Sequence, residues 1–139
     1  MKYRQAGLVP ALAVVALAVG CSARINSVMI DRETGSRRWD IDNVFLSNDI
    51  RILDIQEEEK DGQLFVNILL KNGWGMPIGG KLKVQFYDNN GVQLDDPWGW
   101  HQINLETLQE EWFRFIAPKP ADQIGRMKVM VRGINKYSS

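Results

Sequence analysis

Alternation between apolar and polar positions runs through most of the chain and predicts short β-strands. In residues 64–70 every second side chain is aliphatic, and Phe65 and Leu69 make the opposite face apolar as well. A strand that is apolar on both faces is typical of the middle of a sheet or sandwich. Residues 81–87 and 127–132 alternate so that one face is more apolar, as expected for strands with one side against a core.

Turn signals separate these strands. Asp-Gly at residues 61–62 and Asn-Asn-Gly at residues 89–91 predict hairpin turns, because Asn and Gly tolerate positive φ. The glycine-containing segments 72–80 and 95–99 are predicted loops. Only residues 105–111 offer a helical turn. The remaining strand candidates are residues 44–46, 50–55, 92–94, 101–105 and 111–116.

These elements predict an all-β fold over residues 43–134, an immunoglobulin-like antiparallel β-sandwich of about seven strands. Residues 21–42 mix Asn, Ser, Gly and charged residues around one apolar island at residues 28–30. A segment of this composition has few apolar side chains to bury in a core, so it predicts a flexible tether. Residues 135–139 are expected to form a C-terminal tail.

The N-terminus has the pattern of a targeting segment. Lys2 and Arg4 precede the uncharged, apolar residues 8–19. This pattern predicts a secretory signal peptide over residues 1–20. The apolar run is too short to cross a hydrocarbon core of about 30 Å comfortably, which favours a signal peptide over a transmembrane anchor.

Residues 17–21, Leu-Ala-Val-Gly-Cys, resemble the lipobox of bacterial lipoproteins, whose cysteine receives a diacylglyceryl group. The usual pattern has Leu where this chain has Ala18. Cys21 is the only cysteine, so it cannot form an internal disulfide, and acylation would account for it. The alternative is an ordinary cleaved signal peptide, in which Cys21 is present by coincidence and is not acylated. Ser22 in place of Asp resembles the outer-membrane address of enterobacterial lipoproteins, rather than the inner-membrane one.

Charge adds little to this interpretation. The 139 residues include 17 basic and 17 acidic side chains, and cleavage before Cys21 would remove only Lys2 and Arg4 from these. The mature chain is therefore close to neutral, and no basic patch suggests nucleic-acid binding. The length allows one domain.

Tryptophan is the most informative residue type. Trp74, Trp98 and Trp100 lie in or beside the two predicted loops, and Met76 lies in the first of them. If the hairpin at residues 89–91 lies at the far end of the sheet, the chain returns and these four side chains form one aromatic cluster at one end of the sandwich. Such clusters are favoured at binding surfaces. The alternative is that the rings plug the open end and cover the core.

The order of several short motifs resembles the YcfL-like small periplasmic lipoproteins, a family of uncharacterised function. The resemblance covers residues 44–133 and the signal peptide, and it implies an immunoglobulin-like sandwich without any known activity or site residues. The motifs are a strand ending in Leu70-Lys71-Asn72, then Phe86-Tyr87-Asp88 with Gly91, Trp98 or Trp100 before Ile103-Asn104-Leu105, Ala117-Pro118 with Ala121, and residues 127–132.

Candidate chemistry is sparse. His101 is the only histidine, and no nucleophile elbow accompanies it, so we expect an ordinary strand histidine and no catalytic residue. One His and no free Cys suit zinc poorly. Asp88, Asp95 and Asp96 could approach one another and bind calcium weakly, but they lack EF-hand spacing. The run of glutamates at residues 57–59 is expected to be a solvated rim. We therefore expect no metal and no cofactor.

Three functional hypotheses follow. The first is a non-catalytic interaction module, held to the membrane through acylated Cys21, that binds another envelope protein through its aromatic end or an exposed sheet edge. The alternative is binding of peptidoglycan or another glycan by the loop tryptophans. An enzyme is the least supported of the three.

Overall fold

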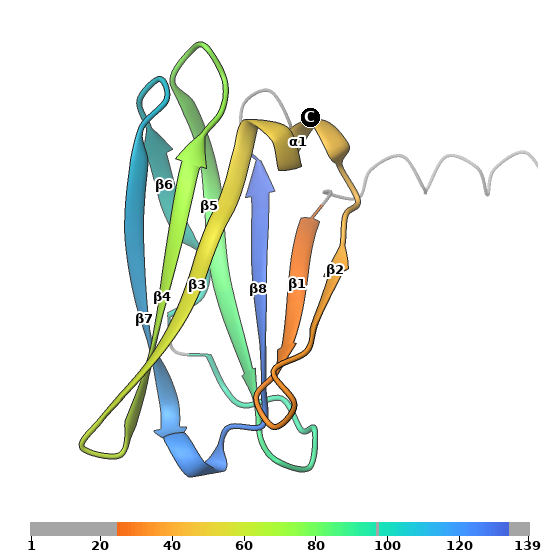
Figure 1. Cartoon of the computed structure of the whole chain (residues 1–139), viewed down its shortest axis with the longest axis vertical. Coiled ribbons are helices and arrows are strands. Elements are labelled where there is room, and N and C mark those ends of the chain that lie inside the picture. The colour runs from red at the N-terminus through yellow and green to blue at the C-terminus, as the bar shows by residue number, and fades with distance from the viewer. Residues whose placement is uncertain (1–24, 97, 134–139) are drawn as a thin grey trace, which may run out of the picture.

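The structure, a computed structural model, describes residues 25–96 and 98–133. Two antiparallel sheets pack face to face (Figure 1). The strands are β1 (Ile25–Asp31), β2 (Arg37–Asp40), β3 (Ile50–Lys60), β4 (Gln63–Asn72), β5 (Ile78–Tyr87), β6 (His101–Leu105), β7 (Glu110–Pro120) and β8 (Arg126–Gly133). Helix α1 (Val44–Asp49) joins β2 to β3, and the 3-10 helix η2 (Ala121–Gln123) precedes β8. The five-stranded sheet has the order β2-β1-β8-β5-β6, and the three-stranded sheet has the order β3-β4-β7. The predicted all-β sandwich is confirmed.

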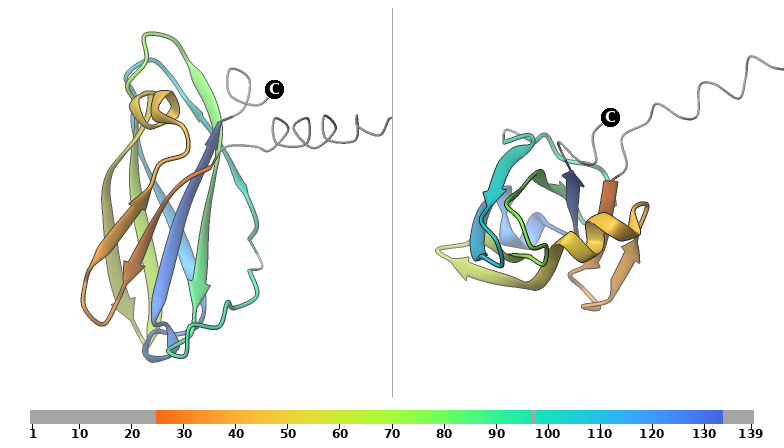
Figure 2. Two further views of the ribbon diagram at one scale, coloured as in Figure 1. Left: turned by 90° about the vertical axis from the view of Figure 1, so that its right-hand side faces the viewer. Right: turned by 90° about the horizontal axis from the view of Figure 1, so that it is seen from above.

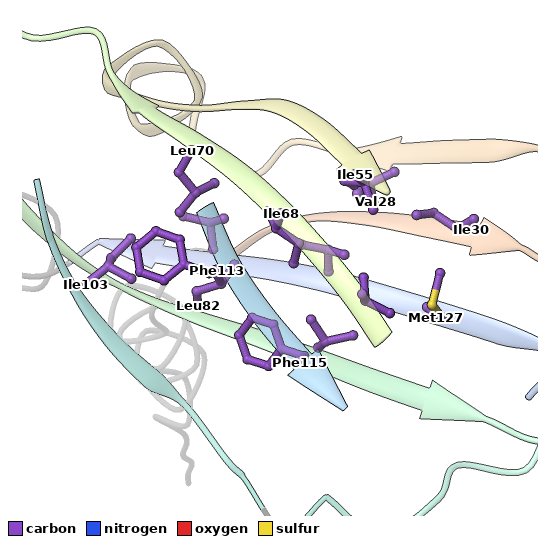
Figure 3. Packing of buried hydrophobic residues seen from close by; sticks show 14 of the residues in the cluster. Val28, Ile30, Ile55, Ile68, Leu70, Leu82, Ile103, Phe113, Phe115 and Met127 are labelled. Atoms are coloured by element: carbon purple, nitrogen blue, oxygen red, sulfur yellow. The ribbon is translucent and has the colours of Figure 1, made fainter. Parts of the chain in front are cut away.

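The core lies between the two sheets (Figure 3). β4 is the central strand of the smaller sheet, as its two apolar faces predicted. Its inward side chains are fully buried, and Phe65 and Leu69 are half-buried on the outer face. Each large aliphatic side chain buried in this way contributes about 1.5–3 kcal/mol. The buried positions of β4 are Leu64, Val66, Ile68 and Leu70.

The predicted hairpin turns are confirmed. Asp61 and Gly62 have φ values of +54° and +78°, and they join β3 to β4 where Lys60 pairs with Gln63. Gly91 has φ +83° in the turn after β5. The strand predicted at residues 92–94 is reduced to one isolated bridge between Tyr87 and Gln93.

The flexible tether predicted at residues 21–42 is wrong from Ile25 onward, because β1 and β2 belong to the larger sheet. The apolar island is the reason. Val28 pairs with Val129 of β8 and Ile30 pairs with Met127, and both side chains are buried in the core. Burial of these two side chains stabilises a strand that its polar neighbours did not suggest. The sandwich therefore includes the described residues 25–42, which the sequence assigned to the tether.

A helix replaces the strand predicted at residues 44–46. The Asn43 side chain accepts a hydrogen bond from the backbone N–H of Leu46 at 3.1 Å and so caps α1. Leu46 is fully buried against the core, whereas Val44 and Phe45 are exposed. The Asn43 cap and the burial of Leu46 both favour this six-residue helix.

The helical turn considered at residues 105–111 is a tight connection between β6 and β7, with Leu108 at φ +61°.

The predicted signal peptide at residues 1–20, Cys21 and the tail at residues 135–139 lie outside the described residues. Among the residues described, no helix has both the length and the apolar character needed to cross a bilayer.

Candidate functional site

The residues predicted to form one aromatic cluster are divided between two places. Trp74 and Met76 lie in the loop between β4 and β5, at the end of the sandwich where β5 begins (Figure 1). Trp98 and Trp100 precede β6, which begins opposite the middle of β5. At about 3.3 Å per residue, half the length of β5 separates the two pairs, so the predicted single cluster is wrong. The last residue of β6, Leu105, pairs with Ile78 and so lies near the β4–β5 loop, whereas the loop before β6 does not.

Asn72, the last residue of β4, holds the β4–β5 loop in place. Its buried Nδ2 donates to the carbonyl oxygen of Met76 at 2.8 Å, and its Oδ1 accepts from the backbone N–H of Trp74 at 2.8 Å. Nδ2 also donates to the carbonyl oxygens of Leu105 and Glu106 at 3.2 Å and 3.0 Å. Trp74 is half-buried and packs on the core, so it covers the end of the sandwich, whereas Met76 is exposed.

Trp100 lies against charged side chains of the larger sheet. The guanidinium of Arg132 is 5.1 Å from the centre of its ring, and the ammonium of Lys83 is 5.8 Å away. Each such cation–π contact contributes about 0.5–1 kcal/mol at an exposed site. Trp100 therefore helps to hold the segment before β6 against β5 and β8.

Trp98 lines a groove of about 210 Å³ between β6 and β7, where the edges of the two sheets approach each other. Its indole Nε1 donates to the carbonyl oxygen of Ile116 at 3.2 Å, so the ring lies across the outer edge of β7. The side chain is nevertheless 57% exposed. The groove is lined by Trp98, His101, Phe113, Arg114, Phe115 and Ile116.

His101 forms the β6 wall of this groove. It is an exposed strand histidine, as expected from the sequence. It alternates in phase with the buried Ile103, which places its ring at the open margin of the core. The ring meets Phe113 edge-on at 5.8 Å and Phe115 at 6.3 Å between centroids. Figure 3 shows Phe113 and Phe115 pointing between the sheets, so the groove opens onto the core.

The side chains that line the groove are mostly aromatic. Its lining residues include no carboxylate, hydroxyl or thiol beside the imidazole. Arg114 is already engaged, since its guanidinium is 4.1 Å from the Phe65 ring centre and 3.4 Å from Glu58. Aromatic walls with one polar ring are suited to an apolar or aromatic side chain of a partner. His101 and Ile103 are two residues apart in one strand, so their side chains lie on the same face. This spacing is the sequence signal that could have identified His101 as a wall of the groove.

The aspartates considered for calcium have local roles. One carboxylate oxygen of Asp88 accepts two backbone N–H groups of its own turn. Asp96 Oδ1 accepts from the backbone N–H of Trp98 at 2.9 Å. Asp96 Oδ2 is buried without a hydrogen bond and lies 3.7 Å from Lys83 Nζ, while Asp95 is exposed. Within the described part of the chain, no group of three or more His, Cys, Asp or Glu side chains is placed to hold a metal ion.

Arg32 organises the opposite end of the sandwich and was not identified from the sequence. Its Nη1 donates to the carbonyl oxygens of Ala121 and Ile124 at 2.6 Å and 2.7 Å. Its Nε and Nη2 bind Glu57 and Glu59 at 2.8 Å and 3.3 Å. Because Glu58 pairs with Arg114, all three glutamates of the predicted solvated rim are ion-paired. These partners are distant in the chain, so no local pattern could have revealed them.

Comparison with known proteins gives a family and a fold. A family model described as "Protein of unknown function (DUF1425)" matches residues 37–133. The chain is similar to the crystal structure of a DUF1425 family member from Shewanella sp. pv-4, with a TM-score of 0.56 and 21% identity over 78% of this chain and 96% of that chain. It is also similar to Campylobacter jejuni cj0090, with a TM-score of 0.49 and 16% identity over 59% of this chain and 84% of that chain. No curated protein matches the chain.

Proposed function

This chain belongs to the DUF1425 family of proteins of unknown function, and we propose that it is a lipid-anchored, non-catalytic module of the bacterial envelope that binds another envelope protein. Within the family, we propose that it is one of the YcfL-like lipoproteins, whose short motifs it resembles. The observation that carries the binding proposal is the exposed Trp98 beside the aromatic groove between β6 and β7.

The anchor rests on the N-terminal sequence. A basic start, an uncharged apolar run at residues 8–19 and a lipobox-like segment end at Cys21, the only cysteine of the chain. Cleavage and acylation there would place the domain on the periplasmic side of a membrane. Because Ser22 follows, we propose the outer membrane. Mass spectrometry of the membrane-derived chain tests this directly: Cys21 should be the acylated N-terminus, and an unmodified Cys21 would contradict the anchor.

The groove has the properties of a contact site between proteins. Exposed tryptophans next to a well-packed apolar wall are the residue type that most often dominates binding energy. Trp98 is held in position by its hydrogen bond to Ile116 and by that of its backbone N–H to Asp96. A ring that is already ordered loses little conformational entropy when a partner binds. The partner expected here presents an apolar or aromatic side chain that fits a groove of about 210 Å³.

Strand addition at the sheet edges is less favoured than the groove. Trp98 covers one carbonyl on the edge of β7, and Arg37 Nη2 donates to the edge carbonyl of Ile55 on β3 at 3.1 Å. β3 also has a register shift at Leu53 and a charged second half. The outer strands of the larger sheet, β2 and β6, are only four and five residues long. Bulges, charges and short strands are features that block edge pairing.

The non-catalytic part of the proposal rests on the composition of the groove. His101 is the one side chain of the groove that could serve as a base, and its ring neighbours are Phe113 and Phe115. A histidine base needs a nucleophile within hydrogen-bond reach and a group that orients it. Neither type lines the groove.

The test is capture of envelope proteins by the full, membrane-derived chain, in the wild-type form and in two variants. Trp98→Ala removes the exposed ring of the groove. Trp112→Ala is the matched control, because Trp112 is 47% exposed on β7 but does not line the groove. One protein that is retained by wild type and Trp112→Ala and lost with Trp98→Ala would support the proposal. Equal capture by all three forms would contradict it.

Glycan binding is the second candidate, favoured by the exposure of Trp98. A sugar ring can stack on an exposed indole, but Trp74 and Trp100 pack against the protein itself. A row of rings along a glycan chain is therefore not formed by these residues. Retention of peptidoglycan fragments in the same capture experiment, with loss in Trp98→Ala, would favour this candidate over a protein partner.

A further inference from the structure

One end of the sandwich has exposed apolar side chains at the tips of three separate segments. α1, the β4–β5 loop and the β6–β7 turn all lie at this end, as Figure 1 and the view from above in Figure 2 show. The exposed fractions are 63% for Val44, 73% for Phe45, 58% for Met76 and 60% for Leu108. Scattered exposed apolar residues are normal, but exposed apolar side chains on three neighbouring segments at one end of the sandwich indicate a contact surface.

The three segments are fastened together, so this apolar end is a defined surface. The backbone N–H of Gly73 donates to the carbonyl oxygen of Asp49 at 2.8 Å, which links the β4–β5 loop to α1. The backbone N–H of Asn72 donates to the carbonyl oxygen of Gln109 at 2.9 Å, and its side chain reaches Glu106. These bonds join all three segments to the end of β4.

Leu108 is present at a position that disfavours it. Its φ of +61° lies in the left-handed region, which costs a residue with a Cβ about 1–2 kcal/mol relative to the ordinary region. Asn or Gly would relieve this strain, but neither would present an apolar tip. An apolar side chain that is both strained and exposed is consistent with a role in contact with another surface.

The position of the first strand limits where Cys21 can lie. Ile25 begins β1 in the same half of the sandwich, level with Lys81 near the start of β5. The Asn26 side chain is bonded to the start of α1. Only residues 22–24 separate Ile25 from Cys21. A chain extends at most about 3.6 Å per residue, so the Cα atoms of Cys21 and Ile25 are within about 14 Å of each other. An acyl chain on Cys21 therefore holds this end of the domain close to the bilayer.

We propose that the apolar end, formed by Val44, Phe45, Met76 and Leu108, rests on the membrane and inserts these side chains among the lipid headgroups. The inference depends on the acylated Cys21 of the proposed function. Asp42 precedes α1, Glu106 lies in the β6–β7 turn, and both carboxylates are exposed, so the contact depends on the apolar side chains and not on attraction to anionic lipid. Two kinds of attachment, acyl chains and apolar side chains, would then fix the orientation of the domain.

This orientation determines where the groove faces. β5 runs ten residues away from the apolar end to Tyr87, about 30 Å at 3.3 Å per residue. The groove lies along the side of the sandwich, where β6 starts opposite the middle of β5. Trp98 would therefore be exposed to the periplasm, above the membrane surface and accessible to a partner.

Site-specific fluorescence on the full acylated chain, reconstituted into phosphatidylcholine vesicles, tests the proposal. Phe45→Cys and Leu108→Cys each introduce one thiol for a polarity-sensitive dye. Val92→Cys is the matched control, because Val92 is 59% exposed in the turn at the opposite end. All three side chains are more than half exposed, so the core is unaffected. We expect blue-shifted emission and strong quenching by spin-labelled lipid at positions 45 and 108, and neither at position 92.

Equal emission and equal quenching at all three positions would overturn the orientation while leaving the anchor intact. The unsubstituted chain separates the two claims, because Cys21 is its only cysteine. An acylated Cys21 has no free thiol to react with the dye. Labelling of the unsubstituted chain would show a free thiol and would contradict both the anchor and the orientation that depends on it.

Discussion

Asn26 and Asn43 exchange two hydrogen bonds across 17 residues of sequence: Asn26 Nδ2 donates to the carbonyl oxygen of Asn43 at 2.7 Å, and the backbone N–H of Asn43 donates to Asn26 Oδ1 at 2.8 Å. Asn43 is also the N-cap of α1. One buried amide therefore connects the first strand to the helix that bridges the two sheets. The connection keeps α1 at the end of the domain where β1 begins.

Asn26→Ala should lower the free energy of unfolding by about 2 kcal/mol, because it leaves the backbone N–H of Asn43 without its partner. Urea unfolding should show a lower midpoint with an unchanged slope. Asn104→Ala, an exposed asparagine of β6, is the matched control and should change stability by less than about 0.5 kcal/mol. Similar losses for both variants would show that the bonds of Asn26 contribute nothing specific.

Asn72→Ala should loosen the β4–β5 loop and the β6–β7 turn together. The buried amide has partners in both segments, and its removal leaves several polar groups unsatisfied, at a cost of about 3 kcal/mol. Hydrogen exchange is the suitable measurement, since the backbone N–H of Trp74 donates to Asn72 Oδ1. Protection should fall at Trp74. Unchanged protection there would contradict the assigned role of Asn72.

Arg32→Lys should reduce stability by about 2 kcal/mol and lower Tm by roughly 10 °C, because a single ammonium cannot replace a planar group that binds four partners. Arg126→Lys is the matched control: Arg126 is exposed and its ion pair with Asp31 is long, at 4.0 Å. Such pairs contribute little. Calorimetry that finds equal Tm changes for the two variants would refute this assignment.

Substitution of Trp98 should affect partner binding, whereas substitution of Trp100 should affect the stability of the fold. Trp100→Leu removes the ring between Lys83 and Arg132 and should lower stability by about 1–2 kcal/mol while partner capture is retained. Trp98→Leu should abolish partner capture and change the free energy of unfolding less than Trp100→Leu does. Chemical denaturation and capture measured on the same two proteins check this. If Trp100→Leu alone abolished capture, the binding site would be assigned to the wrong tryptophan.

The sandwich could be predicted because its main signals are local. The buried face of β4 and the turn at Asp61-Gly62 are both visible in a few consecutive residues. α1 could not be predicted from its apolar run, since Val44-Phe45-Leu46 is equally typical of a strand. Asn43 was the available signal, because asparagine is a common N-cap.

The candidate site was less predictable because it depends on register. Which residue of β5 faces His101 decides whether Trp98 lies at the end or at the side of the sandwich, and no pattern in the sequence specifies that pairing. β1 was missed for a related reason. Val28 and Ile30 gain their burial from β8, which is about a hundred residues away in the chain.

Photo-crosslinking in living bacteria tests the central claim, binding of an envelope protein at the groove, most directly. A photoreactive phenylalanine is placed at His101, which lines the groove, or at the neighbouring Gln102, which is exposed and does not line it. The account predicts one discrete crosslinked protein from position 101, none from position 102, and loss of the product when Trp98→Ala is added. No product from position 101, or the same product from both positions, would contradict it.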